Sequence, residues 1–159
     1  MGNFSALRDW FCRENGISNN VLIVDFSDSD WFEQIESLRG FLSEQIDGFC
    51  TAFDIEYMMR NSYGLCYVCP NNLPGEFRST IIVRPEKGLA TIFHELVHWR
   101  QHCQGHLQTL LWEGPVVEKL WYGVSFPSST PYNKRPWEIE ARMEEDMWVK
   151  AYKEKKNAA

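Results

Sequence analysis

Long apolar runs are missing from this 159-residue chain. No stretch approaches the roughly 20 apolar residues that a membrane-spanning helix needs, so we expect no membrane span. The first nine residues also lack the apolar segment of a secretory signal peptide. These two absences together predict a cytoplasmic protein.

An excess of basic residues is missing as well. The chain holds 16 Lys and Arg against 22 Asp and Glu, which gives a net charge of −6. Proteins that bind nucleic-acid phosphates without sequence preference need a strongly basic surface. We therefore expect no nucleic-acid partner.

The five cysteines of the chain have irregular spacing. An odd number in a chain without an export signal predicts reduced thiols. Cys66 and Cys69 form one C-x-x-C pair, but no second pair follows to complete a structural zinc site. In a strand these two residues would lie on opposite faces, which favours two buried thiols over a metal or redox pair.

Histidine occurs four times, and two of these residues share one motif. His94 and His98 enclose Glu95 in an H-E-x-x-H sequence. The surrounding residues 88–103 place apolar side chains at helical spacing, which predicts a helix. Because residues four apart share a helix face, both imidazoles can bind one Zn²⁺, with Glu95 as general base toward the water that the metal activates. The alternative is a core helix whose histidines are only hydrogen-bonded.

The remaining histidines do not fit as a third ligand. His102 lies about 12 Å along the helix axis from His94, too far for both to join His98 on one ion. In the longer H-E-x-x-H-x-x-G-x-x-H motif, Gln101 replaces the glycine and Gln104 the last histidine. We expect His102 and His106 to be surface or capping residues.

Length and composition predict one α+β domain over residues 1–159, with 44% hydrophobic residues. The aromatic content of 14% is high, and a dense core is its expected destination. Helices are predicted at 4–14, 30–46, 88–103, 107–122 and from Pro136 onward; strands are predicted at 20–26, 63–69 and 78–84; loops are predicted at 70–75 and 123–135. These elements predict a small, mainly antiparallel sheet packed on helices, whose edge strand could hold an extended peptide.

A catalytic zinc takes three protein ligands and keeps one position open. Glu138 and Glu140, at the start of the last predicted helix, are the candidates for the third ligand. Ligand geometry alone does not choose between them. Either residue could instead be a solvated acid at a helix N-terminus, where negative charge is favourable.

The H-E-x-x-H motif followed by Glu138-Ile139-Glu140-Ala141 resembles the gluzincin type of metallopeptidase. The similarity is greatest to small members such as the ImmA/IrrE-like and phage-encoded H-E-x-x-H proteins. In these proteins the motif is followed by a downstream E-x-x-A-[N/D]. The resemblance is specific for residues 94–98 and 136–142 and implies a zincin-like fold.

Carried over residue by residue, the resemblance implies that His94, His98 and Glu138 are the metal ligands and that Glu95 is the catalytic base. Arg142 departs from the pattern, because these relatives usually have Asn or Asp there. In such enzymes that residue often orients a ligand histidine, so another group must do so here.

The predicted function is therefore that of a zinc-dependent metallopeptidase acting on a peptide or protein substrate. The competing hypothesis is a regulatory or protein-binding module that holds zinc without turnover. Peptide hydrolysis also benefits from a group that stabilises the oxyanion. The sequence offers Tyr122, Tyr132, Arg135 and His102 for this role and does not rank them.

Overall fold

The computed structural model describes residues 4–31, 33–34, 59–60, 62–68, 79–111 and 117–158. Most of the helix predicted at 30–46, the loop predicted at 70–75 and the relation of Cys66 to Cys69 lie outside these residues. Within them, no helix is long and apolar enough to cross a membrane.

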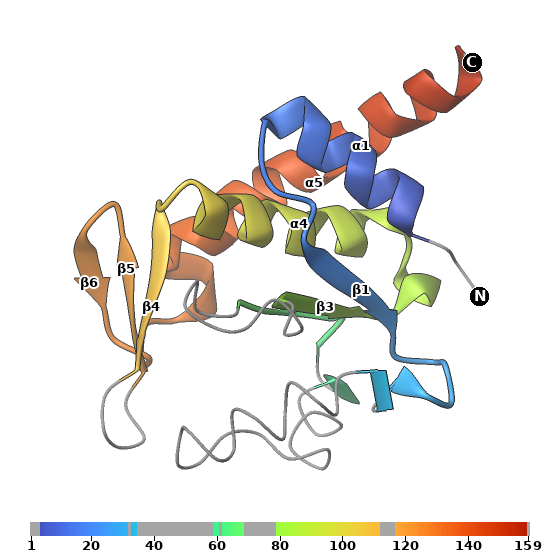
Figure 1. The fold of residues 1–159 in the computed structure, drawn as a ribbon. Helices are drawn as coiled ribbons and strands as arrows, with labels where there is room; N and C mark the ends of the chain where they lie inside the picture. The colour runs from blue at the N-terminus through green and yellow to red at the C-terminus, as the bar shows by residue number, and fades with distance from the viewer. Residues whose placement is uncertain are drawn as a thin grey trace.

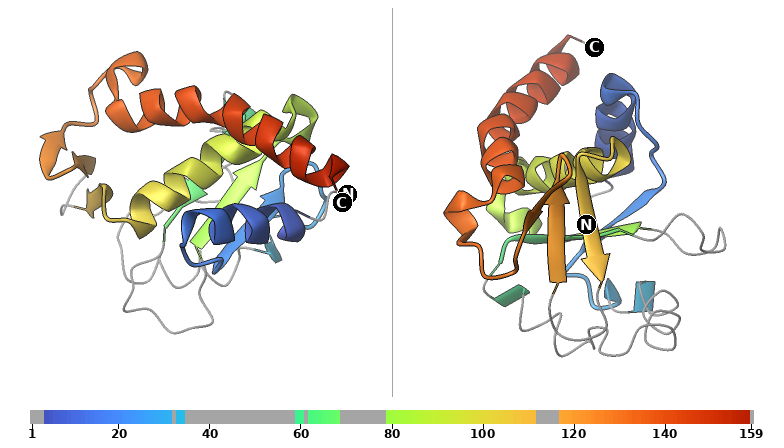
Figure 2. Two further views of the ribbon diagram at one scale, coloured as in Figure 1. Left: turned by 90° about the horizontal axis from the view of Figure 1, so that it is seen from above. Right: turned by 90° about the vertical axis from the view of Figure 1, so that its left-hand side faces the viewer.

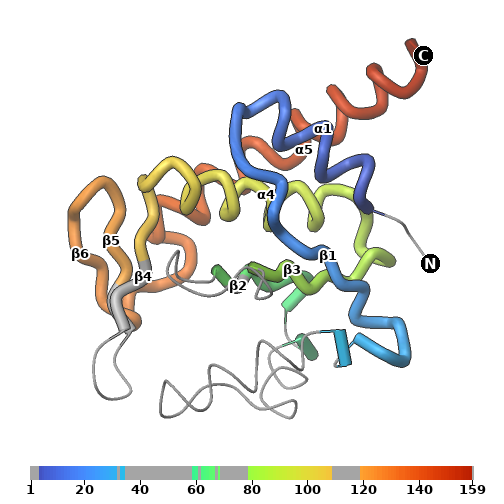
Figure 3. Tube along the Cα trace, viewed as in Figure 1, coloured from blue at the N-terminus to red at the C-terminus, as the bar shows by residue number. Residues whose placement is uncertain are grey.

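Three of the predicted strands form the first sheet. It consists of β1 (Val21–Asp25), β3 (Ser79–Val83) and β2 (Gly64–Tyr67), in that order. Strand β3 pairs in parallel with β1 and antiparallel with β2 (Figure 3). All five residues of β3 are buried, as its unbroken β-branched sequence predicts for a central strand. The three strand predictions are confirmed.

The H-E-x-x-H segment forms helix α4 (Leu89–Cys103), as predicted. Helix α4 lies between the first sheet and two further helices, α1 (Ser5–Asn15) and α5 (Pro136–Asn157) (Figure 1). Seen from above, α5 crosses over α4 (Figure 2). Helix α5 begins at Pro136, where a proline loses no helical hydrogen bond.

The main core fills the space among these helices and the sheet. Its centre is a group of aromatic rings, with Phe11 4.9 Å from Trp148 and Trp10 5.2 Å from Tyr152 between ring centroids. Phe93 of α4 lies 6.2 Å from Trp10 and is fully buried. This cluster is where much of the high aromatic content resides, as expected.

The prediction of a helix over residues 107–122 is wrong. This part of the chain contributes strands β4 (Leu107–Leu111), β5 (Val117–Trp121) and β6 (Val124–Phe126) to a second, antiparallel sheet. The loop predicted at 123–135 contains β6 and a short 3₁₀ turn, Tyr132–Lys134.

The turn between β5 and β6 explains this error. Tyr122 and Gly123 have φ of 48° and 81°, the paired left-handed conformations of a two-residue hairpin turn. Short apolar runs fit a helix or a strand equally well, and here pairing across the hairpin decided for strands. Among the described strands three of four pairings are antiparallel, so the α+β class is confirmed, with two sheets where one was expected.

Candidate metal centre

The packing of α5 on α4 sets the geometry of the centre. Arg100 of α4 is only 8% exposed and contacts two carboxylates of α5. Its Nη2 donates to Glu140 Oε1 over 2.9 Å, and its Nη1 donates to Glu144 Oε1 over 2.7 Å. Because these acids lie one turn apart, Arg100 aligns the two helices along their length.

Three side chains from the two helices converge on one point. His94 Nε2 lies 3.0 Å from Glu138 Oε2, and His98 Nε2 lies 3.2 Å from the same oxygen. The two Nε2 atoms are 3.2 Å apart. The side chains of His94, His98 and Glu138 are 12%, 10% and 12% exposed.

The tautomer of His98 follows from Gln101. The Gln101 Nε2 amide donates to the Trp137 carbonyl over 3.0 Å and to Glu140 Oε2 over 3.1 Å. Its Oε1 must therefore be the atom that lies 2.8 Å from His98 Nδ1. An amide oxygen only accepts, so His98 carries its proton on Nδ1 and presents a lone pair from Nε2.

His94 is oriented in the same way by a carboxylate. Its Nδ1 lies 2.7 Å from Glu145 Oε2, and a carboxylate accepts the proton on that nitrogen. Both Nε2 atoms and the Glu138 oxygen are then aimed at the same small volume. Three electron-rich atoms at this separation repel one another unless a cation or a proton lies among them.

The electrostatics of the cluster also favour a positive charge. Burial opposes the charged form of His94, but the carboxylates of Glu138, Glu95 and Glu145 outweigh it and raise the pKa of His94 to about 9. The pKa of Glu138 is well below its usual range, because hydrogen bonds from the histidines and Tyr132 overcome the effect of burial. The pocket thus attracts either a proton or a metal cation.

Glu95 lies apart from this cluster, against strand β2. Its side chain is buried, at 6% exposure, and burial raises the pKa of its carboxyl above the usual value. A Cβ on Gly64 would lie 2.7 Å from both Cγ and Oε1 of Glu95. The glycine therefore allows β2 to approach the carboxylate closely.

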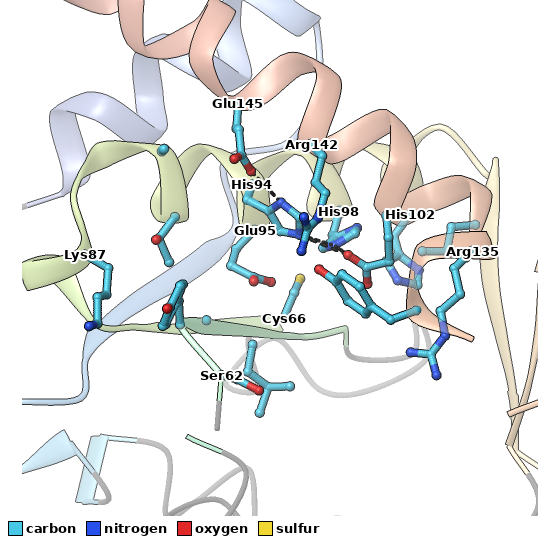
Figure 4. Close-up of a pocket in the computed structure, with 18 of the residues that line it drawn as sticks. Ser62, Cys66, Lys87, His94, Glu95, His98, His102, Arg135, Arg142 and Glu145 are labelled. Atoms are coloured by element: carbon cyan, nitrogen blue, oxygen red, sulfur yellow. Dashed lines mark hydrogen bonds and ion pairs between the residues drawn. The ribbon is translucent and has the colours of Figure 1, made fainter. Parts of the chain in front are cut away.

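A pocket of about 780 Å³ opens over the cluster. Its walls come from α4, β2, α5 and β5 (Figure 4). Of the oxyanion candidates, Tyr132, Arg135 and His102 line the pocket. Tyr122 does not: it is 61% exposed, and its hydroxyl lies 3.0 Å from His106 Nδ1.

The sequence predicts a surface or capping role for His102, and the structure places this residue close to the candidate centre. His102 is half-buried and lines the pocket. Burial, aided by the nearby positive charge of Lys119, lowers the pKa of His102 to about 4, so the imidazole is neutral at physiological pH. It is not part of the converging cluster, as its distance along the helix predicted.

In the structure the two acids at the start of α5 have different partners. Glu138 reaches the histidines, whereas Glu140 is directed to Arg100 and Gln101. Arg142 orients neither histidine, and its guanidinium lies 5.0 Å above the ring of Tyr132.

Sequence reasoning missed the residues that orient the imidazoles, Gln101 and Glu145. The signal for both was helical spacing. Glu145 follows Glu138 by seven residues, two turns along the same face, and Gln101 follows His98 by three.

Comparisons with known proteins leave the chain without an assigned relative: no protein-family model, curated protein or solved structure matches it significantly.

Proposed function

We propose that the protein is a zinc-dependent metallopeptidase with a zincin-like fold. The observation that carries the proposal is the convergence of two imidazole lone pairs and one carboxylate oxygen, each pair of atoms 3.0 to 3.2 Å apart. The three ligands would be His94, His98 and Glu138. A cation among these three atoms would remove the repulsion between them.

The donor set fits zinc. Two histidine nitrogens and one carboxylate oxygen form a ligand set found in catalytic zinc sites, which keep a fourth position open. Ligands about 2.05 Å from a tetrahedral zinc ion lie roughly 3.3 Å from each other. The observed separations are close to this value, so only small adjustments would accommodate the ion. The hydrogen bonds from Gln101 and Glu145 to Nδ1 are the outer contacts expected around histidine ligands.

Zinc, when bound, polarises a substrate carbonyl and lowers the pKa of water. Glu95 is the residue that moves the proton: it takes one from the attacking water and delivers it to the departing amine. Burial raises the pKa of Glu95, which makes its protonated form accessible for the second of these steps. Cleavage of an amide bond by this sequence leaves Glu95 in its starting state.

Strand β2 would hold the substrate. It lines the pocket from Gly64 to Cys66, and among the described strands it pairs only with β3. Within the described part of the chain no strand pairs with its other edge, where an extended peptide could pair through backbone hydrogen bonds. The scissile carbonyl would then lie between β2 and helix α4, where Glu95 is located.

The test combines metal analysis with one substitution. We expect the purified protein to hold about one zinc per chain and to cleave peptides from a mixed library, as measured by elemental analysis and mass spectrometry. Glu95→Gln should keep the zinc and lose cleavage, because an amide cannot accept the proton. Glu154→Gln, an exposed acid on α5, is the matched control and should behave as the wild type.

Cleavage by Glu95→Gln at the wild-type rate would remove Glu95 as the base. A wild-type protein that holds zinc and cleaves no peptide would instead be a regulatory or protein-binding module. A protein that does not bind zinc at all would contradict both hypotheses.

A further inference from the structure

The charges that line the pocket differ from those of the chain as a whole. The chain has a net charge of −6, yet the described residues of the pocket include four bases and three acids. The bases are Lys87, Lys119, Arg135 and Arg142, and the acids are Glu95, Glu138 and Glu145. A zinc ion would add two further positive charges to this wall.

The three acids are already engaged. Glu138 contacts both histidines, and Glu145 contacts Nδ1 of His94. Glu95 is buried against β2. None of them forms an ion pair with a lysine or arginine of the pocket within the described part of the chain.

None of the four bases forms an ion pair with a carboxylate among the same residues. Arg135 donates to two neutral carbonyls, those of Thr130 at 2.9 Å and Ser128 at 3.4 Å. Arg142 stacks over a tyrosine ring. The ammonium of Lys87 lies 5.1 Å from the ring of Tyr63, which attracts it without neutralising its charge.

Lys119 is the most enclosed of these cations. It is half-buried on β5, and its Nζ lies 5.5 Å from the centre of the Trp137 ring. A charged ammonium shielded from water is costly unless an anion accompanies it. Glu138 and Glu95 attract the charge of Lys119 electrostatically, but neither forms an ion pair with it, so a ligand carboxylate would be its first direct anionic partner in the described pocket.

The bases also surround the candidate metal centre. Lys87 lies at one end of the pocket and Arg135 at the other, with the histidine cluster between them (Figure 4). A peptide bound across the centre would therefore pass positive charge on both sides of its scissile bond. Steering and binding of an anionic segment are the expected results of such a wall.

We propose that the substrate is a peptide with a carboxylate close to the scissile bond and that Lys119 binds this carboxylate. The inference rests on the proposed function, because it takes the scissile bond to lie at the histidine cluster. The carboxylate could belong to an acidic side chain or to a free C-terminus. The chemistry recognised by an ammonium is the same in both cases.

The experiment measures binding and not turnover. Three mixtures of heptapeptides with randomised neutral positions are titrated into the Glu95→Gln protein by calorimetry. The first has glutamate at the centre and blocked ends, the second has glutamine at the centre and blocked ends, and the third is the second with a free C-terminal carboxylate. We expect the first or the third mixture to bind about tenfold more tightly than the second. Equal binding of all three would overturn the proposal.

Substitutions then assign the preference. Lys119→Met, made in the Glu95→Gln background, keeps the apolar length of the side chain and removes its charge. It should remove the preference for the carboxylate and leave the affinity for the second mixture unchanged. Lys87→Met, at an exposed position, should reduce the preference by a smaller factor, and Lys153→Met, exposed on α5 outside the pocket, should not alter it. A full preference in the Lys119→Met protein would refute the assignment of Lys119.

Zinc itself attracts carboxylates, so each titration is repeated after chelation. A preference that depends on Lys119 in both states supports the proposal, and one that disappears with the metal overturns it. The outcome is separate from that of the proposed function. A zinc enzyme that cleaves neutral peptides as well as acidic ones would overturn this inference alone. A protein without zinc or cleavage that still prefers carboxylates through Lys119 would overturn only the metallopeptidase.

Discussion

At the residue scale, the position of Glu95 depends on the glycine at position 64, which leaves room for the carboxylate. Gly64 has no Cβ, and an added one would lie 2.7 Å from the Glu95 carboxylate and its Cγ. The backbone of Gly64 does not have a positive φ, so alanine is conformationally allowed there. Any effect of the extra methyl group would therefore come from contact with Glu95.

We predict that Gly64→Ala reduces the cleavage rate by roughly ten- to a hundredfold, because a displaced base no longer reaches the attacking water. Zinc content should stay as in the wild type, since the ligands come from α4 and α5. Steady-state kinetics and elemental analysis measure the two effects. Val68→Ala, on the exposed continuation of β2, is the control. A fully active Gly64→Ala protein would show that Glu95 tolerates displacement and is not a precisely placed base.

A second prediction at this scale concerns the proton that zinc must displace. Carboxylates around His94, acting against burial, raise its pKa to about 9 in the metal-free protein. His94 is thus protonated below about pH 9 and must lose that proton to bind metal. We expect about one proton to be released per zinc at pH 7, and the apparent zinc affinity to rise with pH until about 9. Calorimetry in buffers of different ionisation enthalpy measures this release, and its absence would mean that His94 is already neutral in the metal-free protein.

At the element scale, the candidate centre is a product of how α5 packs on α4. Helix α4 contributes both imidazoles, and α5 contributes Glu138 together with Glu145, which contacts Nδ1 of His94. Arg100 connects the helices through Glu140 and Glu144. The acid that the sequence left as an alternative ligand, Glu140, therefore serves to align the helix that carries the other.

Removing the contact between Glu145 and His94 tests this arrangement. Glu145→Gln should weaken zinc binding by about ten- to a hundredfold, the usual effect of losing an outer partner of a ligand histidine. Competition with a chromogenic chelator measures the affinity. Asp146→Asn changes the charge of the next, exposed residue by the same amount and should have little effect. Equal affinities in the two variants would mean that Glu145 does not support the metal.

At the scale of the whole molecule, the metal would join two helices that also enclose the core. Zinc would bind only the folded arrangement of His94, His98 and Glu138, so it should stabilise the protein by mass action. Zinc at about a thousand times its dissociation constant would add roughly 4 kcal/mol to the free energy of unfolding. We expect chelation to lower the melting temperature in thermal denaturation. His94→Ala should melt at the same temperature with and without chelator, and a similar shift in that variant would assign the effect to another site.

Local pattern was enough to predict much of this protein. Short-range side-chain patterns predicted helix α4, helix α1 and the three strands of the first sheet. Each pattern involves only residues that are close together in the sequence. The spacing of His94 and His98 on one helix face is equally local, because helical geometry alone places them together. For the same reason the sequence could nominate Glu138 and Glu140 as third ligands without choosing between them.

Tertiary structure decided what depends on distant partners. Residues 107–111 and 117–121 became strands through pairing with each other and with β6, although the composition of this region also allowed a helix. The angle and register of α5 on α4 brought Glu138 to the histidines and turned Glu140 toward Arg100. No pattern in the sequence of β2 predicts that this strand approaches Glu95. Likewise, no pattern in β5 predicts that Lys119 reaches the pocket. A periodic pattern records which face of an element is apolar, whereas a site of this kind depends on contacts between elements that lie far apart in the chain.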